Sequence, residues 1–197
     1  MSTTMDASIS RQPKAIIILS GKRKSGKDFI SHLLLQRLGS NKCGVLHLSG
    51  PLKKQYAKEH NLDYEKLLDA SDYKEQYRLD MIQWGEERRN KDPGFFCRLA
   101  TDDKGSEKDI WIISDARRKS DICYFKDHFS KATITVRVQS DLAVRNNRGF
   151  VFTEGIDDAE SECGLDTGID WDIIIKNNDS QQELEQGLNT LLSLIPL

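Results

Sequence analysis

The sequence lacks the features that mark membrane, secreted and zinc-binding proteins. Its four cysteines include no CxxC pair, and no histidine lies at a metal-ligand spacing, so neither a zinc site nor a disulfide framework is indicated. No apolar run approaches the length of a membrane span, and the polar first thirteen residues lack the apolar stretch of a secretory signal. We therefore expect reduced thiols, a cytosolic location and no membrane insertion. The C-terminal residues 195–197 lack the basic residue of an SKL-type peroxisomal address.

The chain also has little net charge, −2 at pH 7, which argues against general nucleic-acid binding. Its basic residues are nevertheless clustered at residues 22–27, 88–91, 117–119 and 145–148, and an acidic cluster covers residues 157–162. Such clusters predict one basic cleft on an otherwise neutral body. Any one of them, taken alone, could equally be a solvated surface.

With 197 residues, 38% apolar and 30% charged, the chain has the size and composition of one globular domain. We find no internal repeat, linker or low-complexity segment. The predicted organisation is a flexible tail over residues 1–14 and a single domain over residues 15–197, and we expect a monomer.

Short apolar runs alternate with stretches of helical periodicity. The runs predict five strands, at residues 15–19, 44–48, 110–113, 132–138 and 173–175. Helices are predicted at residues 26–38, 53–60, most of 64–103 with a break at Pro93-Gly94, 121–129 and 184–195, with a turn at 49–51. This alternation indicates a three-layer α/β domain with a mainly parallel five-stranded sheet.

The strongest chemical signal is GKRKSGKD at residues 21–28, which fits G-x-x-x-x-G-K between a predicted strand and a predicted helix. In that setting backbone N–H groups surround the phosphates of ATP, and Lys27 reaches the β- and γ-oxygens. The alternative is a glycine-rich turn that only joins two elements. The predicted ATP-phosphate ligands are Gly21, Lys22, Arg23, Lys24, Ser25, Gly26, Lys27 and Asp28.

Asp28 stands where such loops usually have a serine or threonine whose hydroxyl binds Mg²⁺. A carboxylate there could hold Mg²⁺ directly or through water, or it could face the acceptor as a base. It could also simply cap the helix. The sequence leaves these interpretations open.

A second signal is the apolar run at residues 110–113, which ends at Ser114-Asp115 and resembles a Walker B strand. Ligands of open α/β sheets lie at the carboxyl ends of the strands. Asp115 is therefore a predicted Mg²⁺ ligand that holds the ion through its waters, and Arg117 and Arg118 are predicted to face the phosphates.

Phosphoryl transfer between two anions requires cations that hold each phosphate and neutralise the charge of the transition state. The available arginines are Arg78, Arg89, Arg98, Arg117, Arg118, Arg145 and Arg148. Together with the loop, they predict a small P-loop kinase that moves the γ-phosphoryl group of ATP onto a small anionic acceptor.

Six segments together resemble the animal-type phosphomevalonate kinase family. They are SGKRKSGKDF (20–29), LSGPLK (48–53), WGEERR (84–89), DPGFFCR (92–98), SDARR (114–118) and DDAESECGLD (157–166). The resemblance implies a nucleoside-monophosphate-kinase-like fold and transfer from ATP to 5-phosphomevalonate, giving ADP and 5-diphosphomevalonate in isoprenoid and sterol synthesis. It also accounts for Asp28, because the family's loop likewise ends in Lys-Asp.

The resemblance further implies roles for individual residues. Those of the catalytic loop and cleft are Lys22, Lys24, Lys27, Asp28, Arg117 and Arg118. Those of the acceptor site are Lys53, Arg78, Arg89, Arg98 and Arg118, in a helical region at about 50–104. Those of the nucleotide and the lid, at about 140–168, are Arg137, Arg145, Arg148 and Asn177, although residues 141–147 and 181–190 match the family poorly.

Two other functions remain open on the sequence. A nucleoside- or nucleotide-monophosphate kinase would share the fold and the loop. A nucleotide-dependent switch would need a guanine-reading N-K-x-D segment, but Lys176-Asn177-Asn178-Asp179 has the wrong order.

Overall fold

A five-stranded sheet forms the centre of the computed structural model, which describes residues 12–68, 72–102 and 104–196. The strand order is β2-β3-β1-β4-β5, and all four neighbouring pairs are parallel. The strands are β1 (Ala15–Ser20), β2 (Cys43–Leu46), β3 (Ile110–Ile113), β4 (Thr133–Gln139) and β5 (Ile173–Lys176). All six residues of β1 are buried, as its continuous apolar run requires of a central parallel strand. The predicted parallel sheet is confirmed.

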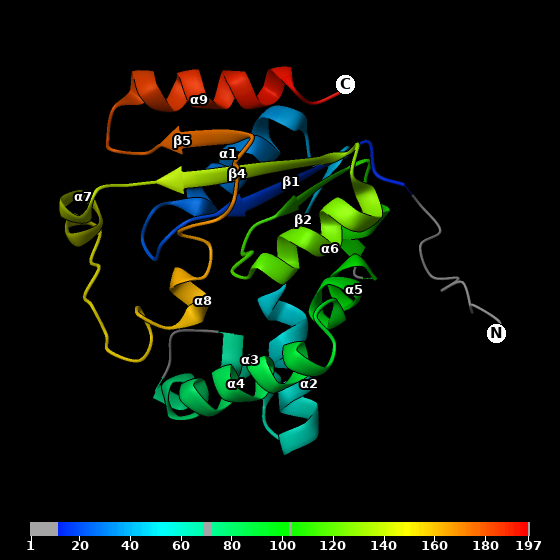
Figure 1. The fold of residues 1–197 in the computed structure, drawn as a ribbon, viewed down its shortest axis with the longest axis vertical. Helices are drawn as coiled ribbons and strands as arrows, with labels where there is room; N and C mark the ends of the chain where they lie inside the picture. Colours follow the sequence, from blue (N-terminus) through cyan, green and yellow to red (C-terminus); the bar gives the residue numbers. More distant parts are fainter. Residues whose placement is uncertain (1–11, 69–71, 103, 197) are drawn as a thin grey trace.

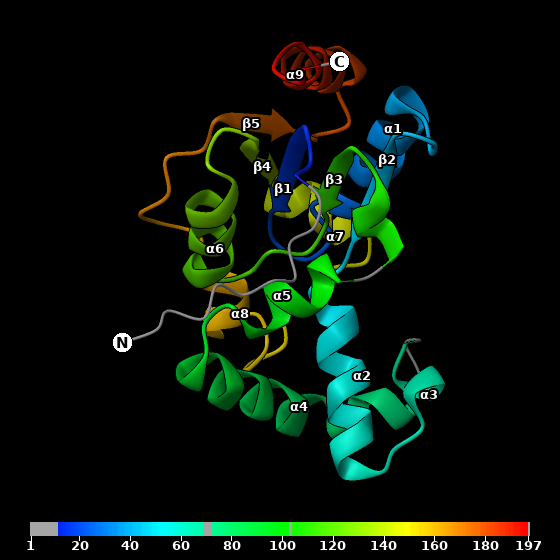
Figure 2. The same ribbon diagram turned by 90° about the vertical axis from the view of Figure 1, so that its right-hand side faces the viewer.

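Helices cover both faces of this sheet. One face packs against α1 (Lys27–Leu38) and α9 (Gln181–Ser193), and the other packs against α5 (Phe95–Thr101) and α6 (Lys119–Phe129). Figure 2 shows the two layers on opposite sides of the strands. The predicted three-layer architecture is therefore confirmed.

A second group of helices extends below the sheet in Figure 1. It consists of α2 (Ser49–His60), α3 (Tyr64–Leu68) and α4 (Asp72–Lys91), which share a small core of their own around Tyr56, Leu67 and Met81. A 3-10 turn, η1 (Lys104–Glu107), leads back into β3. Between β4 and β5 lie two short helices, α7 (Leu142–Asn147) and α8 (Glu160–Cys163).

The predicted turn at residues 49–51 is wrong, because these residues form the first turn of α2. Pro51 is tolerated there, since the first N–H groups of a helix have no partner within the helix. The helices α7 and α8 were not predicted, and β2 starts and ends earlier than expected. Residues 1–11 of the predicted tail and Leu197 lie outside the described residues. Within the described part of the chain, none of the helices has the length and apolarity that crossing a bilayer would require.

Candidate active site

Residues 21–26 form a tight loop between the end of β1 and the start of α1. Lys24 and Gly26 both have a positive φ, 62° and 94°. A side chain on Gly26 would overlap the amide of Asn177, and one on Gly21 would overlap the backbone oxygen of Val138. Close packing and left-handed backbone geometry therefore both require glycine at Gly26.

Lys27 folds back over this loop from the first turn of α1. Its Nζ donates to the carbonyl oxygens of Gly21, at 2.5 Å, and Lys22, at 3.2 Å. Burial lowers the pKa of Lys27 to about 8, and the neighbouring charge of Arg117 adds to this effect. Among the described residues, the hydrogen bonds of this half-buried ammonium go to carbonyl oxygens, which it can exchange for the oxygens of an anion.

The two predicted Mg²⁺ ligands have different surroundings. Asp28 is exposed in the first turn of α1, and its side chain makes no cap to the helix, whose N-cap is Gly26. Asp115 accepts backbone N–H groups from Leu48, at 2.7 Å, and Ser49, at 3.0 Å, at the start of α2. Asp115 thus fixes α2 against the end of β3, while Asp28 is open to solvent beside the phosphate loop.

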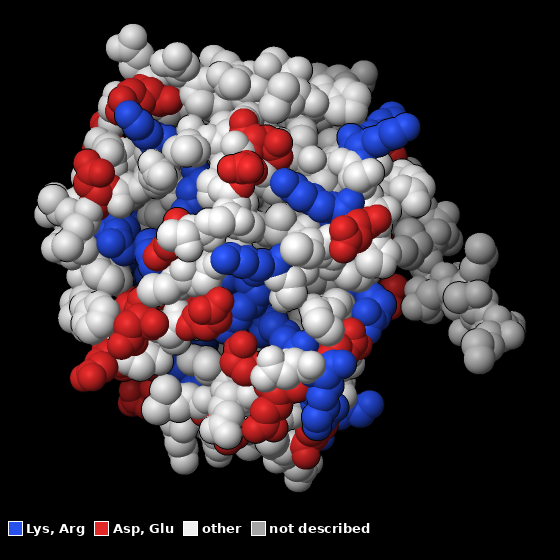
Figure 3. Space-filling view, in the orientation of Figure 1, with Lys and Arg blue, Asp and Glu red and all other residues white. Residues whose placement is uncertain are grey.

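A cleft of about 230 Å³ lies between the loop, the helices α2 and α4, and the turn that follows β3. Figure 3 shows basic side chains gathered in the middle of this face, with acidic side chains around them. The basic residues that line the cleft are Arg23, Lys53, Lys74, Arg78, Arg89, Arg117 and Arg118. This concentration of positive charge suits a ligand that carries several negative charges.

Arg89 and Arg118 form the buried wall of the cleft. Arg118 is 6% exposed and binds the carboxylate of Glu86 through Nε and Nη2. Its Nη1 and the Nε of Arg89 are buried polar atoms without a hydrogen-bond partner among the described residues. Because a buried donor without a hydrogen bond is costly, Nη1 of Arg118 indicates where a ligand would bind, whereas Nε of Arg89 lies 3.8 Å from Asp121.

Asp121, in the first turn of α6, organises the same wall from behind. It is 1% exposed, and its Oδ2 accepts the backbone N–H groups of Arg117 and Arg118, each at 3.0 Å. Its Oδ1 lies 3.8 Å from Nε of Arg89. Burial raises the pKa of Asp121, whereas Arg89 and the two N–H groups oppose that shift. Its position, three residues after the N-cap Arg118, is the sequence signal of a capping carboxylate that could have identified it.

The acidic segment 157–166 supplies counter-charges to the phosphate loop. Asp166 contacts Nζ of Lys22 at 2.5 Å and Nη2 of Arg137 at 2.6 Å. The buried Glu162 accepts the backbone N–H of Arg23 at 3.2 Å and pairs with Arg117. In Figure 1, α8 lies beside the loop that leads into α1. Lys22 of the loop, together with Arg117 and Arg137 near it, is therefore paired with carboxylates from one distant segment.

The residues predicted for the nucleotide also converge on this loop. Asn177 is buried and donates its Nδ2 to the backbone oxygen of Ser25 at 2.8 Å. Nη2 of Arg148 donates to the backbone oxygen of Asn177 at 3.0 Å. The guanidinium of Arg145 lies over the ring of Phe150 at 4.5 Å, and its Nη1 is 3.4 Å from the backbone oxygen of Arg23. A phosphate loop, a basic cleft and a ring of arginines together form a site for phosphoryl transfer.

Comparison with known proteins identifies the family. A family model described as phosphomevalonate kinase matches residues 19–131, more than half of the chain. A phosphomevalonate kinase from Drosophila melanogaster is 42% identical over 187 residues, which cover 92% of this chain and 97% of that protein. This chain belongs to the phosphomevalonate kinase family.

Two solved structures are similar to this family member, and one of them supports its fold. The Thermus thermophilus protein TT1252 has a TM-score of 0.55 at 16% identity, over 95% of this chain and all of that one. A gluconokinase from Sinorhizobium meliloti has a TM-score of 0.49 at 13% identity, over 94% of this chain and 95% of that one. At such identities the likeness with TT1252 concerns the fold alone.

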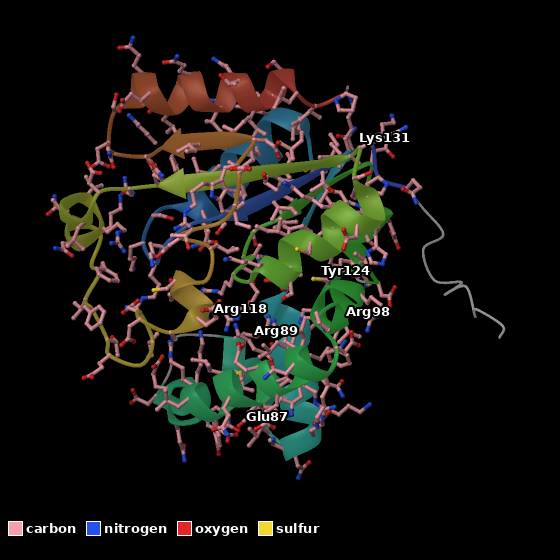
Figure 4. All side chains as sticks on the ribbon, viewed as in Figure 1. Glu87, Arg89, Arg98, Arg118, Tyr124 and Lys131 are labelled. Carbon is pink, nitrogen blue, oxygen red and sulfur yellow. The ribbon has the colours of Figure 1, made fainter. Side chains whose placement is uncertain are left out.

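The structure does not bring all predicted residues of this family member into the cleft. Lys24 is exposed on the loop. Arg98 pairs with Asp92 and does not line the cleft, and Figure 4 shows it on α5, apart from Arg89 and Arg118. Arg78 and Lys53 line the cleft, and burial lowers the pKa of Lys53, with Lys74 adding to the shift. Conversely, sequence reasoning assigned no role to Glu86, Asp121, Glu162 or Asp166.

Proposed function

We propose that the basic cleft of this phosphomevalonate kinase family member transfers the γ-phosphoryl group of ATP to the phosphate of 5-phosphomevalonate. The products are ADP and 5-diphosphomevalonate, so the enzyme serves the mevalonate route to isoprenoids and sterols. The observation that carries the proposal is the buried Nη1 of Arg118, which has no hydrogen-bond partner among the described residues, in the wall of a cleft next to the phosphate loop. Family membership names the acceptor.

The mechanism we infer is positional and electrostatic. A phosphate oxygen of the acceptor is already ionised at neutral pH, so its attack on the γ-phosphorus requires no strong general base. Lys27 exchanges its carbonyl partners for phosphate oxygens, while Arg117 and Arg118 offset the negative charge that develops during transfer. Closure of the segment that carries Arg145 and Arg148 would exclude water and limit hydrolysis of ATP.

The residues present also fit Mg²⁺. This ion is usually held by one or two carboxylates together with substrate phosphates, and it needs no larger protein cluster. The described residues contain no group of three or more potential metal-binding side chains. We propose that Asp28, exposed beside the loop, and Asp115, whose oxygens each retain a lone pair, hold the ion directly or through water. When bound, Mg²⁺ would neutralise phosphate charge.

Asp28→Asn tests the Mg²⁺ assignment. We expect the concentration of Mg²⁺ that gives half-maximal rate to rise in this variant, with little change in ATP binding measured by calorimetry. An unchanged Mg²⁺ dependence would instead leave Asp28 as an acidic residue that favours the helix dipole.

The acceptor region at about 50–104 contains α2, α3, α4 and α5, and the lid at about 140–168 contains α7 and α8. We propose that the enzyme acts as a cytosolic monomer that binds no nucleic acid, in line with its net charge of −2. Light scattering after size-exclusion chromatography tests the monomer, and cell fractionation tests the location.

In the decisive experiment, the purified protein is incubated with ATP and 5-phosphomevalonate. In parallel reactions, a panel of nucleoside monophosphates replaces 5-phosphomevalonate. Release of ADP is measured in a coupled assay. We expect turnover with 5-phosphomevalonate and none with the nucleotides. Turnover with a nucleotide would indicate a nucleotide kinase instead, and ATP binding without any transfer would indicate a switch or binding protein.

A further inference from the structure

The acceptor side of the cleft contains a carboxylate where an anion is expected to bind. Glu86 lines the cleft from α4, and its side chain is 33% exposed. A negative charge in this position repels an anionic acceptor, so its presence needs a compensating function.

Glu86 holds Arg118 by two adjacent donors of the same guanidinium, Nε at 3.2 Å and Nη2. A guanidinium is planar and carries five N–H donors in a fixed fork. Two bonds to one carboxylate therefore fix the plane of the whole group, including the direction of its third nitrogen. That nitrogen, Nη1, is the buried donor that no described residue satisfies.

Ion pairs link α4 to the start of α6 across the cleft wall. Glu86 of α4 binds Arg118, which precedes α6, whereas Asp121 of α6 lies 3.8 Å from Arg89 of α4. Glu86 is also 3.8 Å from Nη1 of Arg89. Two arginines and two carboxylates thus form a crossed set without net charge, which keeps the arginines together before any ligand binds.

We propose that Glu86 is a positioning residue for the acceptor. By holding Arg118 through Nε and Nη2, it keeps Nη1 available to the acceptor's anionic group, in the wall that Arg118 shares with Arg89. This inference rests on the proposed function, because the acceptor must be an anion. The charge of Glu86 opposes the acceptor. Glu86 nevertheless raises acceptor affinity, because it fixes Arg118 in the binding geometry before the acceptor arrives.

A competing role would be that of a placeholder, in which the acceptor's phosphate displaces Glu86 from Arg118. The two roles predict opposite signs for the same substitution. Without a placeholder the acceptor binds more tightly, whereas without a positioning residue it binds more weakly.

The test compares Glu86→Gln with Glu87→Gln in steady-state kinetics. Glu87 is the neighbouring residue on α4, and it is exposed (Figure 4). We expect Glu86→Gln to raise the KM for 5-phosphomevalonate about tenfold, in line with the loss of a charge-assisted bond, while the KM for ATP changes less than about twofold. Glu87→Gln should leave both constants near those of the wild type.

Two further variants exclude a merely structural effect. Glu86→Asp retains the charge, so it should recover part of the lost acceptor affinity, and it serves as the test if Glu86→Gln fails to fold. In an Arg118→Met background, Glu86→Gln should have little additional effect on the acceptor KM, because its target is gone. Thermal unfolding of each variant is measured in parallel.

A lower acceptor KM in Glu86→Gln would establish the placeholder and overturn the proposal. Equal losses for ATP and acceptor, or full additivity with Arg118→Met, would overturn it as well. The proposed function is judged separately, by whether the wild-type protein turns over 5-phosphomevalonate in the same assay.

Discussion

The two sides of the cleft obtain their counter-charges in different ways. On the loop side, Lys22, Arg117 and Arg137 pair with Glu162 and Asp166, which belong to one segment far away in the sequence. On the acceptor side, the carboxylates that face Arg89 and Arg118 belong to α4 and α6, the same helices that hold or follow these arginines. The loop side thus depends on a tertiary contact with an irregular segment, whereas the acceptor side is fixed by packed helices.

This difference suggests how each side meets its substrate. The phosphates of ATP would compete with Glu162 and Asp166 for the same cations, so we expect the segment 157–166 to exchange partners when ATP binds. The acceptor side need not exchange its carboxylates, because Nη1 of Arg118 has no hydrogen-bond partner among the described residues and can take up an anion directly. Each side can be disrupted separately, and the expected effects differ in size.

Lys27→Met should have the largest effect. We expect kcat to fall by about two orders of magnitude or more, because the loop loses the cation that offsets charge on the transferred group. Burial lowers the pKa of Lys27 from 10.5 to about 8, so below pH 8 its charge destabilises the folded state, a cost that fades as the pH rises toward 10.5. The variant should therefore unfold at no lower temperature than the wild type at pH 7. Near-normal turnover would remove Lys27 from the mechanism.

Arg118→Met should have the next largest effect, on the acceptor side. We expect kcat/KM for 5-phosphomevalonate to fall by roughly one to two orders of magnitude, through kcat as well as KM, because Arg118 both binds the acceptor and offsets developing charge. The control is Arg88→Met, since Arg88 lies over Trp84 and pairs with Glu59 outside the cleft. If only the KM for one substrate changes, Arg118 has no role in the chemical step.

In the wild-type enzyme, the pH dependence of kcat/KM should differ between ATP and 5-phosphomevalonate. In the free enzyme Lys27 loses its proton as the pH rises through about 8, so kcat/KM for ATP should decline above that pH. Bound phosphates would hold the proton, so kcat should remain level to a higher pH. With ATP saturating, kcat/KM for 5-phosphomevalonate should likewise lack a decline near pH 8, and a parallel decline in both profiles would contradict the assignment.

Arg98→Met should have the smallest effect. Arg98 pairs with Asp92 on the edge of α5 and does not line the cleft, whereas Arg89 does. We expect Arg98→Met to change the acceptor KM less than about threefold, and Arg89→Met to raise it about tenfold or more, as expected for a lost charge-assisted bond. Equal effects of the two substitutions would place Arg98 in the acceptor site after all.

The sequence by itself determined the sheet and the phosphate loop. The apolar side chains of the run AIIILS are all removed from water in a strand that is buried on both faces. The glycines that follow permit the tight loop before α1. Both signals are local, because they depend on neighbouring residues and on backbone geometry. Residues 49–51 could form either a turn or the start of a helix. The prediction of a turn was wrong, because α2 begins at Ser49.

Only the tertiary structure decided which charges face one another. Glu86 and Arg118 are 32 positions apart in the sequence, and Lys22 and Asp166 are farther apart still. A carboxylate that is solvated on one surface and one that orients a buried guanidinium have the same sequence signature, because the difference lies in desolvation and distance. The sequence therefore predicted the arginines of the cleft, while the fold revealed the carboxylates that hold them.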